Sequence, residues 1–376
     1  MTIKLIVLQP TSLCNLNCQY CYVPGRKDST RMSEQTLENV IAKVLRSSIV
    51  DENVEFLWHA GEPLTVGIDF YKKVMTYIQK HNNQDRRIRN RLQTNGTLLT
   101  PDWCEFLLEN DFQIGISIDG PAMLHNRNRI DWSGKGSHHL VMRGLKLLKE
   151  YGLSFGGLCV LTRESLNYPR EIFNFFYSNG FQSVGFNVEE IENANKSSSL
   201  KDYEEHSIIV EKYRSFMSEL FDLWKTHKNE IEFREFRNML TRIEKKLSNK
   251  NYYSVPDEIK SLGIITIQKN GDITTNSPEF AGGLNTEFNN FVVGNINAQY
   301  ELDTVVNSNI YNRMQHEINL GVKNCASSCL YFDLCGGGSP SNKYFENGSL
   351  SSTETIRCIL HHQTLTSIVI EKLLNA

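Results

Sequence analysis

The stretch Cys14–Tyr22 reads Cys-Asn-Leu-Asn-Cys-Gln-Tyr-Cys-Tyr, with cysteines at positions 14, 18 and 21. Thiolates are the usual ligands of iron–sulfur clusters, and a [4Fe–4S] cube has four irons to ligate. Three cysteines in one short loop therefore leave one iron open to a cofactor or substrate. Tyr20, just before the third cysteine, is expected to lie beside that open iron. Zinc normally takes four closed ligands, so a zinc site is the weaker interpretation.

The composition is that of an ordinary globular protein. The chain has 376 residues, of which 40% are apolar and 22% charged, and its net charge is −3. This balance gives no argument for a nucleic-acid or membrane partner. No run reaches the ~18 apolar residues of a membrane span, and Met1–Val7 lacks the features of a signal peptide. We predict a cytoplasmic protein whose nine cysteines serve metal ligation or catalysis rather than disulfides.

Strand-like and helical patterns alternate over the first ~190 residues, which implies parallel strands joined by helical crossovers. The fold class is therefore α/β, a partial (β/α)6 TIM-like barrel. Because sites gather at the carboxyl ends of parallel strands, the polar segments after these strands should converge on one rim. The predicted strands are Ile3–Leu8, Val54–Trp58, Arg89–Gln93, Phe112–Ile118, Ser154–Leu161 and Ser183–Val188.

Local signals also predict several helices and one hairpin. Ser33 should cap a helix, because the apolar residues that follow keep a three–four spacing. Thr100 with Pro101 is a second helix start. Asn270-Gly271 is a typical hairpin turn between two short strand-like runs. We predict a barrel domain over residues 1–195, a charged helical connector over 196–260, and a tail domain over 261–376.

The tail carries a second cysteine cluster. Four cysteines can ligate one [4Fe–4S] cube completely, and the run Gly336-Gly337-Gly338 would let backbone N–H groups approach sulfur. A zinc knot is the alternative, and the four cysteines alone do not decide between the two. The open-iron loop in the same chain favours iron–sulfur. The members of the cluster are Cys325, Cys329, Cys335 and Cys358.

Several polar residues follow the predicted strands. The Glu62 carboxylate could accept from a cationic amine, and Ser117 with Asp119 suits ribose or amino-acid polar groups. Arg129 could hold a carboxylate in bidentate fashion. The alternatives are an exposed turn glutamate and a surface arginine. Three residues that alternate along the sixth strand could face the barrel interior, namely Gly185, Asn187 and Glu189.

The cysteine loop, together with Gly61-Glu62-Pro63, resembles the signature of the radical S-adenosylmethionine (SAM) superfamily. The tail looks like the SPASM/twitch extension of its peptide-modifying members. The resemblance implies SAM and two [4Fe–4S] clusters as cofactors, one of them auxiliary. Cys14, Cys18 and Cys21 would hold the first cluster, and the general base is not indicated. The implied cofactor-binding residues are Tyr20, Gly61, Glu62, Gln93, Asn95, Ser117, Asp119, Arg129 and Leu161.

More narrowly, the chain resembles the maturases that form three-residue cyclophanes in ribosomally synthesised peptides. That resemblance implies a C–C crosslink between an aromatic ring and a nearby side-chain carbon, formed through the 5′-deoxyadenosyl radical. The implied partners are a glycine-rich precursor peptide with aromatic residues and an electron donor such as flavodoxin or ferredoxin. The similar stretches are Leu8–Ser12, Trp58–Pro63, Gln93–Leu98, Ile116–Pro121, Gly185–Glu190, Cys335–Pro340 and Asn342–Ser349.

Two alternatives remain. Anaerobic sulfatase maturases are similar but carry seven extension cysteines and two auxiliary clusters, whereas Gly271–Ser277 has no cysteine here. Formylglycine formation is therefore the weaker enzymatic alternative. A non-catalytic iron–sulfur or zinc protein is the other, and it would leave Glu62, Ser117 and Arg129 without a shared purpose. Because the barrel begins almost at Met1, we expect no amino-terminal leader-binding domain.

Overall fold

A computed structural model describes residues 2–202, 204–298 and 301–375 of the chain. One ten-stranded sheet runs through it in the order β10-β9-β8-β1-β2-β3-β4-β5-β6-β7. Neighbours from β8 through β7 pair in parallel, and β9 runs antiparallel to both β8 and β10. The predicted α/β class with a central parallel sheet is confirmed. The strands are β1 (Ile3–Leu8), β2 (Val50–Trp58), β3 (Arg87–Thr94), β4 (Gln113–Ser117), β5 (Phe155–Leu161), β6 (Ser183–Val188), β7 (Glu232–Phe233), β8 (Ile264–Ile267), β9 (Asp272–Thr275) and β10 (Gly294–Asn295).

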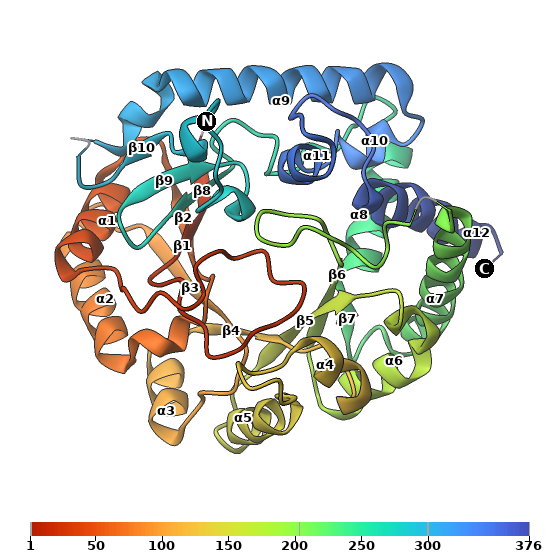
Figure 1. The fold of residues 1–376 in the computed structure, drawn as a ribbon, viewed down its shortest axis with the longest axis horizontal. Helices are drawn as coiled ribbons and strands as arrows, with labels where there is room; N and C mark the ends of the chain where they lie inside the picture. The colour runs from red at the N-terminus through yellow and green to blue at the C-terminus, as the bar shows by residue number, and fades with distance from the viewer. Residues whose placement is uncertain (1, 203, 299–300, 376) are drawn as a thin grey trace.

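The helices lie outside the curved sheet (Figure 1). Both predicted helix starts are confirmed, since Ser33 accepts from the N–H of Thr36 and Thr100 accepts from the N–H of Trp103. The helices are α1 (Glu34–Arg46), α2 (Ile68–His81), α3 (Pro101–Glu109), α4 (Ala122–Asn128), α5 (His138–Glu150), α6 (Pro169–Ser178), α7 (His206–His227), α8 (Arg234–Ser248), α9 (Asn309–Ser328), α10 (Phe332–Cys335), α11 (Pro340–Asn347) and α12 (Leu365–Leu374), with a π-helical turn over Cys358–Thr364.

Strand β2 is longer than the sequence predicts. It begins at Val50 rather than Val54, and Val50 pairs with Ile3 of β1. Residues 51–53 are all polar, so this part of the strand lacks the alternation of apolar and polar side chains from which a strand is predicted. Strands β1 and β6 have the predicted bounds.

The tail is joined to the barrel through the sheet itself. The predicted hairpin forms as β8 and β9, and Gly271 in its turn has φ +89°. Strand β8 then pairs in parallel with β1, from Leu5 opposite Ile264 to Leu8 opposite Ile267. In the connector, β7 pairs with β6. One sheet therefore crosses all three predicted segments, and the boundaries near 195 and 260 stay predictions.

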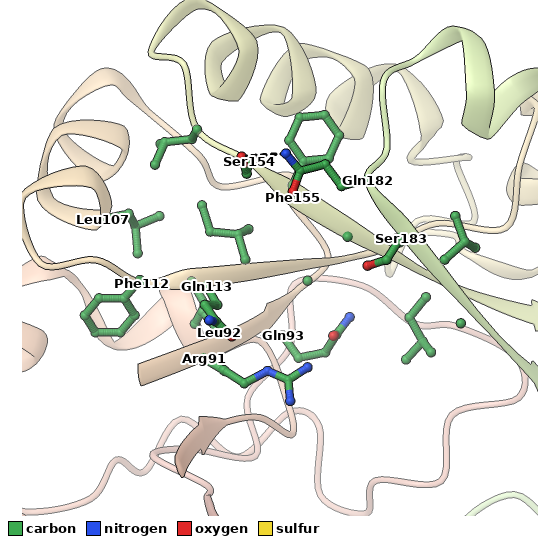
Figure 2. Close-up of a pocket in the computed structure, with 18 of the residues that line it drawn as sticks. Arg91, Leu92, Gln93, Leu107, Phe112, Gln113, Ser154, Phe155, Gln182 and Ser183 are labelled. Atoms are coloured by element: carbon green, nitrogen blue, oxygen red, sulfur yellow. Dashed lines mark hydrogen bonds between the residues drawn. The ribbon is translucent and has the colours of Figure 1, made fainter. Parts of the chain in front are cut away.

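The parallel sheet leaves openings at both of its ends. A cavity with about 1510 Å³ of empty space, part of it open to solvent, lies at the amino-terminal ends of β4, β5 and β6 and beside β3. Figure 2 shows side chains that line it. Small residues line it, and a Cβ on Gly115 would come within 2.2 Å of Oε1 of Gln93. Two arginines of its lining are paired with carboxylates, Arg91 with Glu55 and Arg237 with Glu232. The cysteines lie at the opposite end of the strands.

Among the described residues, every helix is too short or too polar to cross a lipid bilayer.

Candidate functional site

A cavity with about 1030 Å³ of empty space lies at the carboxyl ends of the barrel strands. The three loop cysteines contribute to its wall together with residues that follow β2, β3 and β4. The predicted convergence of the polar segments on one rim is thereby confirmed. Asp119 and Leu161 are the predicted cofactor residues that do not line it. The predicted residues that do are Cys14, Cys18, Tyr20, Cys21, Gly61, Glu62, Gln93, Asn95, Ser117 and Arg129.

The cysteine loop is held by backbone contacts from a distant part of the chain. The N–H groups of Asn17 and Gln19 donate to the carbonyls of Ile130 and Asn128, at 2.7 and 2.9 Å. The indole of Trp132 donates to the carbonyl of Cys14 at 2.9 Å. The segment after α4 therefore supports the loop, which has no regular secondary structure of its own around the cysteines.

Gly61 lets the end of β2 dock against this loop. Its φ is +59°, and a Cβ there would lie 2.6 Å from the carbonyl oxygen of Leu13. The next residue, Glu62, donates its backbone N–H to that same oxygen at 2.7 Å. A side chain at position 61 would push the cysteine loop away from the strand end, so glycine is required by close approach as well as by backbone conformation.

The Glu62 carboxylate is buried and joins β2 to β3. It is 1% exposed, so the alternative of an exposed turn residue is wrong. Its oxygens accept from the N–H of Leu64 at 3.0 Å, from Oγ1 of Thr94 at 2.7 Å and from the N–H of Asn95 at 2.7 Å. Burial raises the pKa of this carboxyl to about 7. A carboxylate has about four acceptor positions, so about one is left toward the cavity.

Two amides order the rim beside Glu62. Nδ2 of Asn95 donates to Oδ1 of Asn15 at 2.9 Å and lies 3.9 Å from Sγ of Cys14. Nε2 of Gln93 donates to Oγ of Ser117 at 2.8 Å. Asn95 thus positions the first loop cysteine, while Gln93 and Ser117 present linked polar groups from neighbouring strands β3 and β4.

Asp119 lies behind the cavity and joins two residues that line it. One of its oxygens accepts from Nη2 of Arg129 and from the N–H of Val160, both at 3.0 Å. The other accepts from the hydroxyl of Tyr20. Asp119 is 2% exposed and does not line the cavity, so its carboxylate holds Tyr20 and Arg129, which do. Leu161 is a fully buried core residue.

Arg129 is buried rather than on the surface, so the alternative of a surface arginine is wrong. It is 7% exposed, and its guanidinium lies 5.4 Å from the centre of the Tyr20 ring. Its Nε is buried and has no hydrogen-bond partner within the described part of the chain. A buried donor without a partner is costly, so this N–H is available to an acceptor bound in the cavity.

The opposite wall of the cavity is acidic and was not predicted as a unit. Glu190, Glu192 and Glu279 line it. Burial raises the pKa of Glu279 to about 7 and that of Glu192 above its usual range, and each is further raised by a neighbouring carboxylate. Glu279 follows β9, far from the barrel strands in sequence. Only the pairing of β8 with β1 brings it here, and no local pattern signals that contact.

The four tail cysteines also converge. Cys325 is near the end of α9, Cys329 follows that helix, Cys335 ends α10, and Cys358 begins the π-helical turn. All four line a second cavity with about 380 Å³ of empty space. Their convergence from separate elements agrees with a shared ligand set.

Three successive glycines shape one side of this second cavity. Gly336, Gly337 and Gly338 have φ values of +80°, +114° and +72°, a run that other residues rarely adopt. Burial raises the pKa of the Cys335 thiol, while the nearby backbones of Gly337 and Gly338 act to lower it. Both glycines line the cavity with Cys335, and a hydrogen bond from their N–H groups to sulfur stays a prediction.

The side-chain geometry bears on which metal group would fit. Among residues 2–202, 204–298 and 301–375, no three Cys, His, Asp or Glu side chains converge closely enough to bind one ion. A single zinc would need all its sulfurs within about 2.3 Å of one point. A [4Fe–4S] cube binds each thiolate at a different iron, so it accommodates cysteines that surround a space. All nine cysteines are free of disulfides.

The two cavities share a wall. Oε1 of Glu192 accepts from Oγ of Ser341 and Nδ2 of Asn342, each at 2.7 Å. Oδ1 of Asn342 accepts from Arg357 at 3.2 Å, and Nε of Arg357 lies 3.5 Å from Glu190. Asn342 and Arg357 line the second cavity, whereas the two glutamates line the first. Polar contacts therefore connect the two cysteine sites directly.

Residues 8–176 match a family model described as "Radical SAM superfamily". An uncharacterized Synechocystis protein, sll1766, is 36% identical over 373 residues, which is 98% of this chain and 91% of that protein. A cysteine-type anaerobic sulfatase-maturating enzyme of Clostridium perfringens is 32% identical over 250 residues, or 64% of this chain and 66% of the enzyme. Among solved structures, native anSMEcpe with bound AdoMet and the Cp18Cys peptide is 25% identical, with a TM-score of 0.79, over 99% of this chain and 98% of that one.

Proposed function

The chain belongs to the radical SAM superfamily and is therefore an enzyme, and we propose that it modifies a side chain of a ribosomally synthesised peptide. The observation that carries this proposal is the rim cavity, where a three-cysteine loop faces buried polar groups with acceptor and donor positions to spare. A peptide substrate is favoured because anSMEcpe, which this chain resembles over 99% of its length, has been solved with a bound peptide.

The residues present fit SAM and a [4Fe–4S] cluster at the rim. Cys14, Cys18 and Cys21 would hold three irons, and the fourth would be open to SAM. A reduced cluster with SAM supplies a 5′-deoxyadenosyl radical that removes a hydrogen atom from an unactivated carbon. The remaining acceptor position of Glu62 suits the amine of SAM, and the unpartnered Nε of Arg129 suits its carboxylate.

The other rim residues orient these two groups. Asp119 keeps the Arg129 guanidinium and the Tyr20 ring in place and does not itself reach the cavity. Gln93 with Ser117 offers polar groups for a ribose. Apolar side chains also line the cavity, among them Leu16, Leu158, Val160 and Val188. They limit the access of water and of competing hydrogens, which is the main task of the protein in radical chemistry.

We further propose that the product is a cyclophane, in which an aromatic ring is joined to a nearby side-chain carbon. Forming this bond removes one hydrogen from each partner, so the ring must give up a proton and an electron. Glu279 can hold the proton, because it faces the cavity and its pKa of about 7 suits a base at neutral pH. An auxiliary [4Fe–4S] cluster at Cys325, Cys329, Cys335 and Cys358 would accept the electron.

Formylglycine formation is the second candidate. It is favoured by the similarity to sulfatase-maturating enzymes from Clostridium perfringens and from Bacteroides thetaiotaomicron, the latter 35% identical over 239 residues. It is disfavoured by the β8–β9 region, where residues 271–277 contain no cysteine. The four tail cysteines suffice for one auxiliary cluster and not for two.

The test is anaerobic co-expression with a glycine-rich, aromatic peptide encoded beside the gene, followed by tandem mass spectrometry. A crosslink product is lighter than its precursor by two hydrogens and keeps one aromatic ring tied to a neighbouring side chain through fragmentation. An aldehyde trapped by a hydrazide reagent at serine or cysteine would support formylglycine instead. Serine oxidation gives the same mass change, so the trapping step is needed.

The remaining partners follow from the same proposal. A low-potential protein such as flavodoxin or ferredoxin would deliver the electron that starts each turnover. The working compartment would be the cytoplasm, where nine free cysteines stay reduced. Purified enzyme with SAM and dithionite should release 5′-deoxyadenosine, which a non-catalytic iron–sulfur or zinc protein would not do.

A further inference from the structure

We propose that Lys343 is the counter-cation of the auxiliary cysteine site and raises the reduction potential of the cluster bound there. The inference rests on the proposed function, because it needs a cluster at the tail cysteines. It concerns a residue that no sequence motif singled out for chemistry. Lys343 lies in α11, and its side chain lines the same cavity as the four cysteines.

The position of the Lys343 ammonium is unusual. The residue is 3% exposed, and Nζ lies 3.5 Å from Sγ of Cys325. Within the described residues, no carboxylate lies within salt-bridge distance of Nζ. The acidic residue one turn further along α11, Glu346, pairs with Lys201 instead. Lysine is almost never fully buried unless it is paired.

A buried ammonium needs an anion close by. Moving an isolated charge out of water is very costly, and neutral thiols do not offset that cost. Four thiolates do, because their charge exceeds that of the iron–sulfur core in both of its redox states. Lys343 therefore fits a negatively charged group bound among the cysteines better than it fits four protonated thiols.

The surrounding chain makes room for this ammonium. On the facing helix α9, a Cβ at Gly321 would lie 3.2 Å from Nζ of Lys343. On the other side, the nearest atom to a Cβ at Gly338 would be Cε of Lys343, at 3.9 Å. Two glycines thus border the lysine side chain, and the ammonium is held against Cys325 rather than directed to solvent.

A fixed positive charge beside the cluster has a definite redox consequence. One-electron reduction adds a negative charge, so a nearby cation stabilises the reduced form more than the oxidised form. Arg242 also acts on Cys335. Arg357 contributes less, because Glu190 and Glu258 lie 3.5 and 3.9 Å from it. Among the described residues, Lys343 is the cation whose side chain donates to a sulfur of the tail cysteines.

This effect suits an electron acceptor. When the crosslinked ring regains aromaticity, it releases one proton and one electron. Glu279 would take the proton, and a cluster held by the tail cysteines would accept the electron. An electron-carrier protein would then take that electron from the cluster before the next turnover. A higher potential makes the first of these electron transfers more favourable.

The test isolates the auxiliary cluster by using Cys14→Ala, Cys18→Ala and Cys21→Ala together as the background. Lys343→Met keeps the length of the side chain and removes its charge, whereas Lys343→Arg keeps the charge. Lys323→Met is the matched control, because Lys323 is an exposed lysine on α9 two residues from Cys325. Iron content is measured first, and the midpoint potential is then followed by EPR during an anaerobic redox titration.

We expect a lower midpoint potential in Lys343→Met, a value near that of the background in Lys343→Arg, and no change in Lys323→Met. If Lys343→Met loses its iron, restored iron in Lys343→Arg still supports a role for the charge. An unchanged potential in iron-replete Lys343→Met, or loss of iron in both variants, would overturn the inference. Zinc instead of iron in the background protein would refute the auxiliary cluster itself, which is a separate failure of the proposed function.

Discussion

The two cysteine sites are built in opposite ways. The first takes three cysteines from one loop of eight residues, between Cys14 and Cys21, and opens on a cavity with about 1030 Å³ of empty space. The second takes four cysteines from separate elements around a cavity with about 380 Å³. An open site with a missing ligand can bind a cofactor, whereas a closed site with a complete ligand set can only pass electrons or hold the fold together.

The charged side chains beside the two sites also differ. At the rim, the cation Arg129 is paired with Asp119, and the buried carboxylate of Glu62 keeps an acceptor position free. At the tail site, the cation Lys343 contacts a cysteine sulfur directly. The first arrangement suits a zwitterionic ligand such as SAM, and the second suits an anionic cluster.

The largest effect is expected from removing the open site. Replacing Cys14, Cys18 and Cys21 by alanine should reduce the iron content after anaerobic reconstitution from about eight to about four per chain. It should also abolish formation of 5′-deoxyadenosine, because no other site leaves an iron open. Iron analysis and liquid chromatography measure the two results. Iron that stays near eight, or nucleoside that still forms, would show that the loop is not the cluster site.

Removal of a ligand at the closed site should separate radical formation from product formation. Cys335→Ala should still cleave SAM to 5′-deoxyadenosine, since Cys335 does not line the rim cavity, but it should make no crosslinked peptide. Loss of a metal group also loosens the domain that it holds, so a thermal melt should accompany the assay. Full crosslinking by Cys335→Ala would contradict an electron-accepting role of the tail site.

The elements around the first cysteine site could be predicted from local sequence. Apolar runs, Ser33 and Thr100 predict the elements around the rim because each signal lies within one element. The rim cysteines could therefore be placed correctly on the fold. The closed site was harder, since the 20-residue helix α9 buries Tyr311, Gly321 and Cys325 among its core positions. Such residues weaken the apolar pattern that predicts a helix.

The sequence predicts which segments meet at the rim, but it does not predict the individual side-chain contacts between distant segments. Asp119 was expected to bind the cofactor, but it does not line the cavity, and it accepts hydrogen bonds from Tyr20, Arg129 and Val160, which come from three different parts of the chain. Glu279 reaches the rim only because β8 pairs with β1. A sequence motif shows which residue types are present. Whether a carboxylate faces a ligand or a neighbouring arginine depends on packing between elements.

A smaller effect is expected at the acidic wall that lies between the two sites. If Glu279 takes the proton during product formation, Glu279→Gln should slow that step by roughly 10²–10⁴-fold. The wild-type rate should rise with pH through about 7, because the pKa of Glu279 is raised to that value and only the ionised form accepts a proton. The rate is measured at saturating SAM, so that ionisation of Glu62, whose pKa is also raised to about 7, does not contribute through SAM binding. Under these conditions the variant should lose the rise.

Glu189→Gln is the matched control for Glu279→Gln. Glu189 also lines the rim cavity, but its carboxylate accepts from Ser199 on the surface loop. We expect its crosslinking rate and pH profile to resemble those of the wild type. A pH profile that keeps its rise in Glu279→Gln would assign the proton transfer to another group.

The smallest effect is expected from Glu62→Gln, which keeps the shape of the side chain and removes its charge. Charge-assisted hydrogen bonds contribute about 1.5–3 kcal/mol, so the affinity for SAM should fall roughly ten- to hundredfold. The structure adds a second consequence. Oε2 of Glu62 accepts from the N–H of Asn95 at 2.7 Å. In one orientation of the glutamine amide, its NH2 group would take the place of this oxygen, and the two N–H donors would then face each other.

Two measurements distinguish these consequences of Glu62→Gln. The affinity for SAM is measured by calorimetry on protein reconstituted with iron, and the melting temperature is measured on the same sample. A weaker affinity with an unchanged melting temperature would assign Glu62 to binding of the SAM amine. A lower melting temperature with unchanged affinity would show that Glu62 only ties β2 to β3. The carboxylate has about four acceptor positions, and the protein fills three of them. We therefore expect both quantities to fall, with the larger change in affinity, because Glu62 lines the cavity and keeps about one acceptor position open.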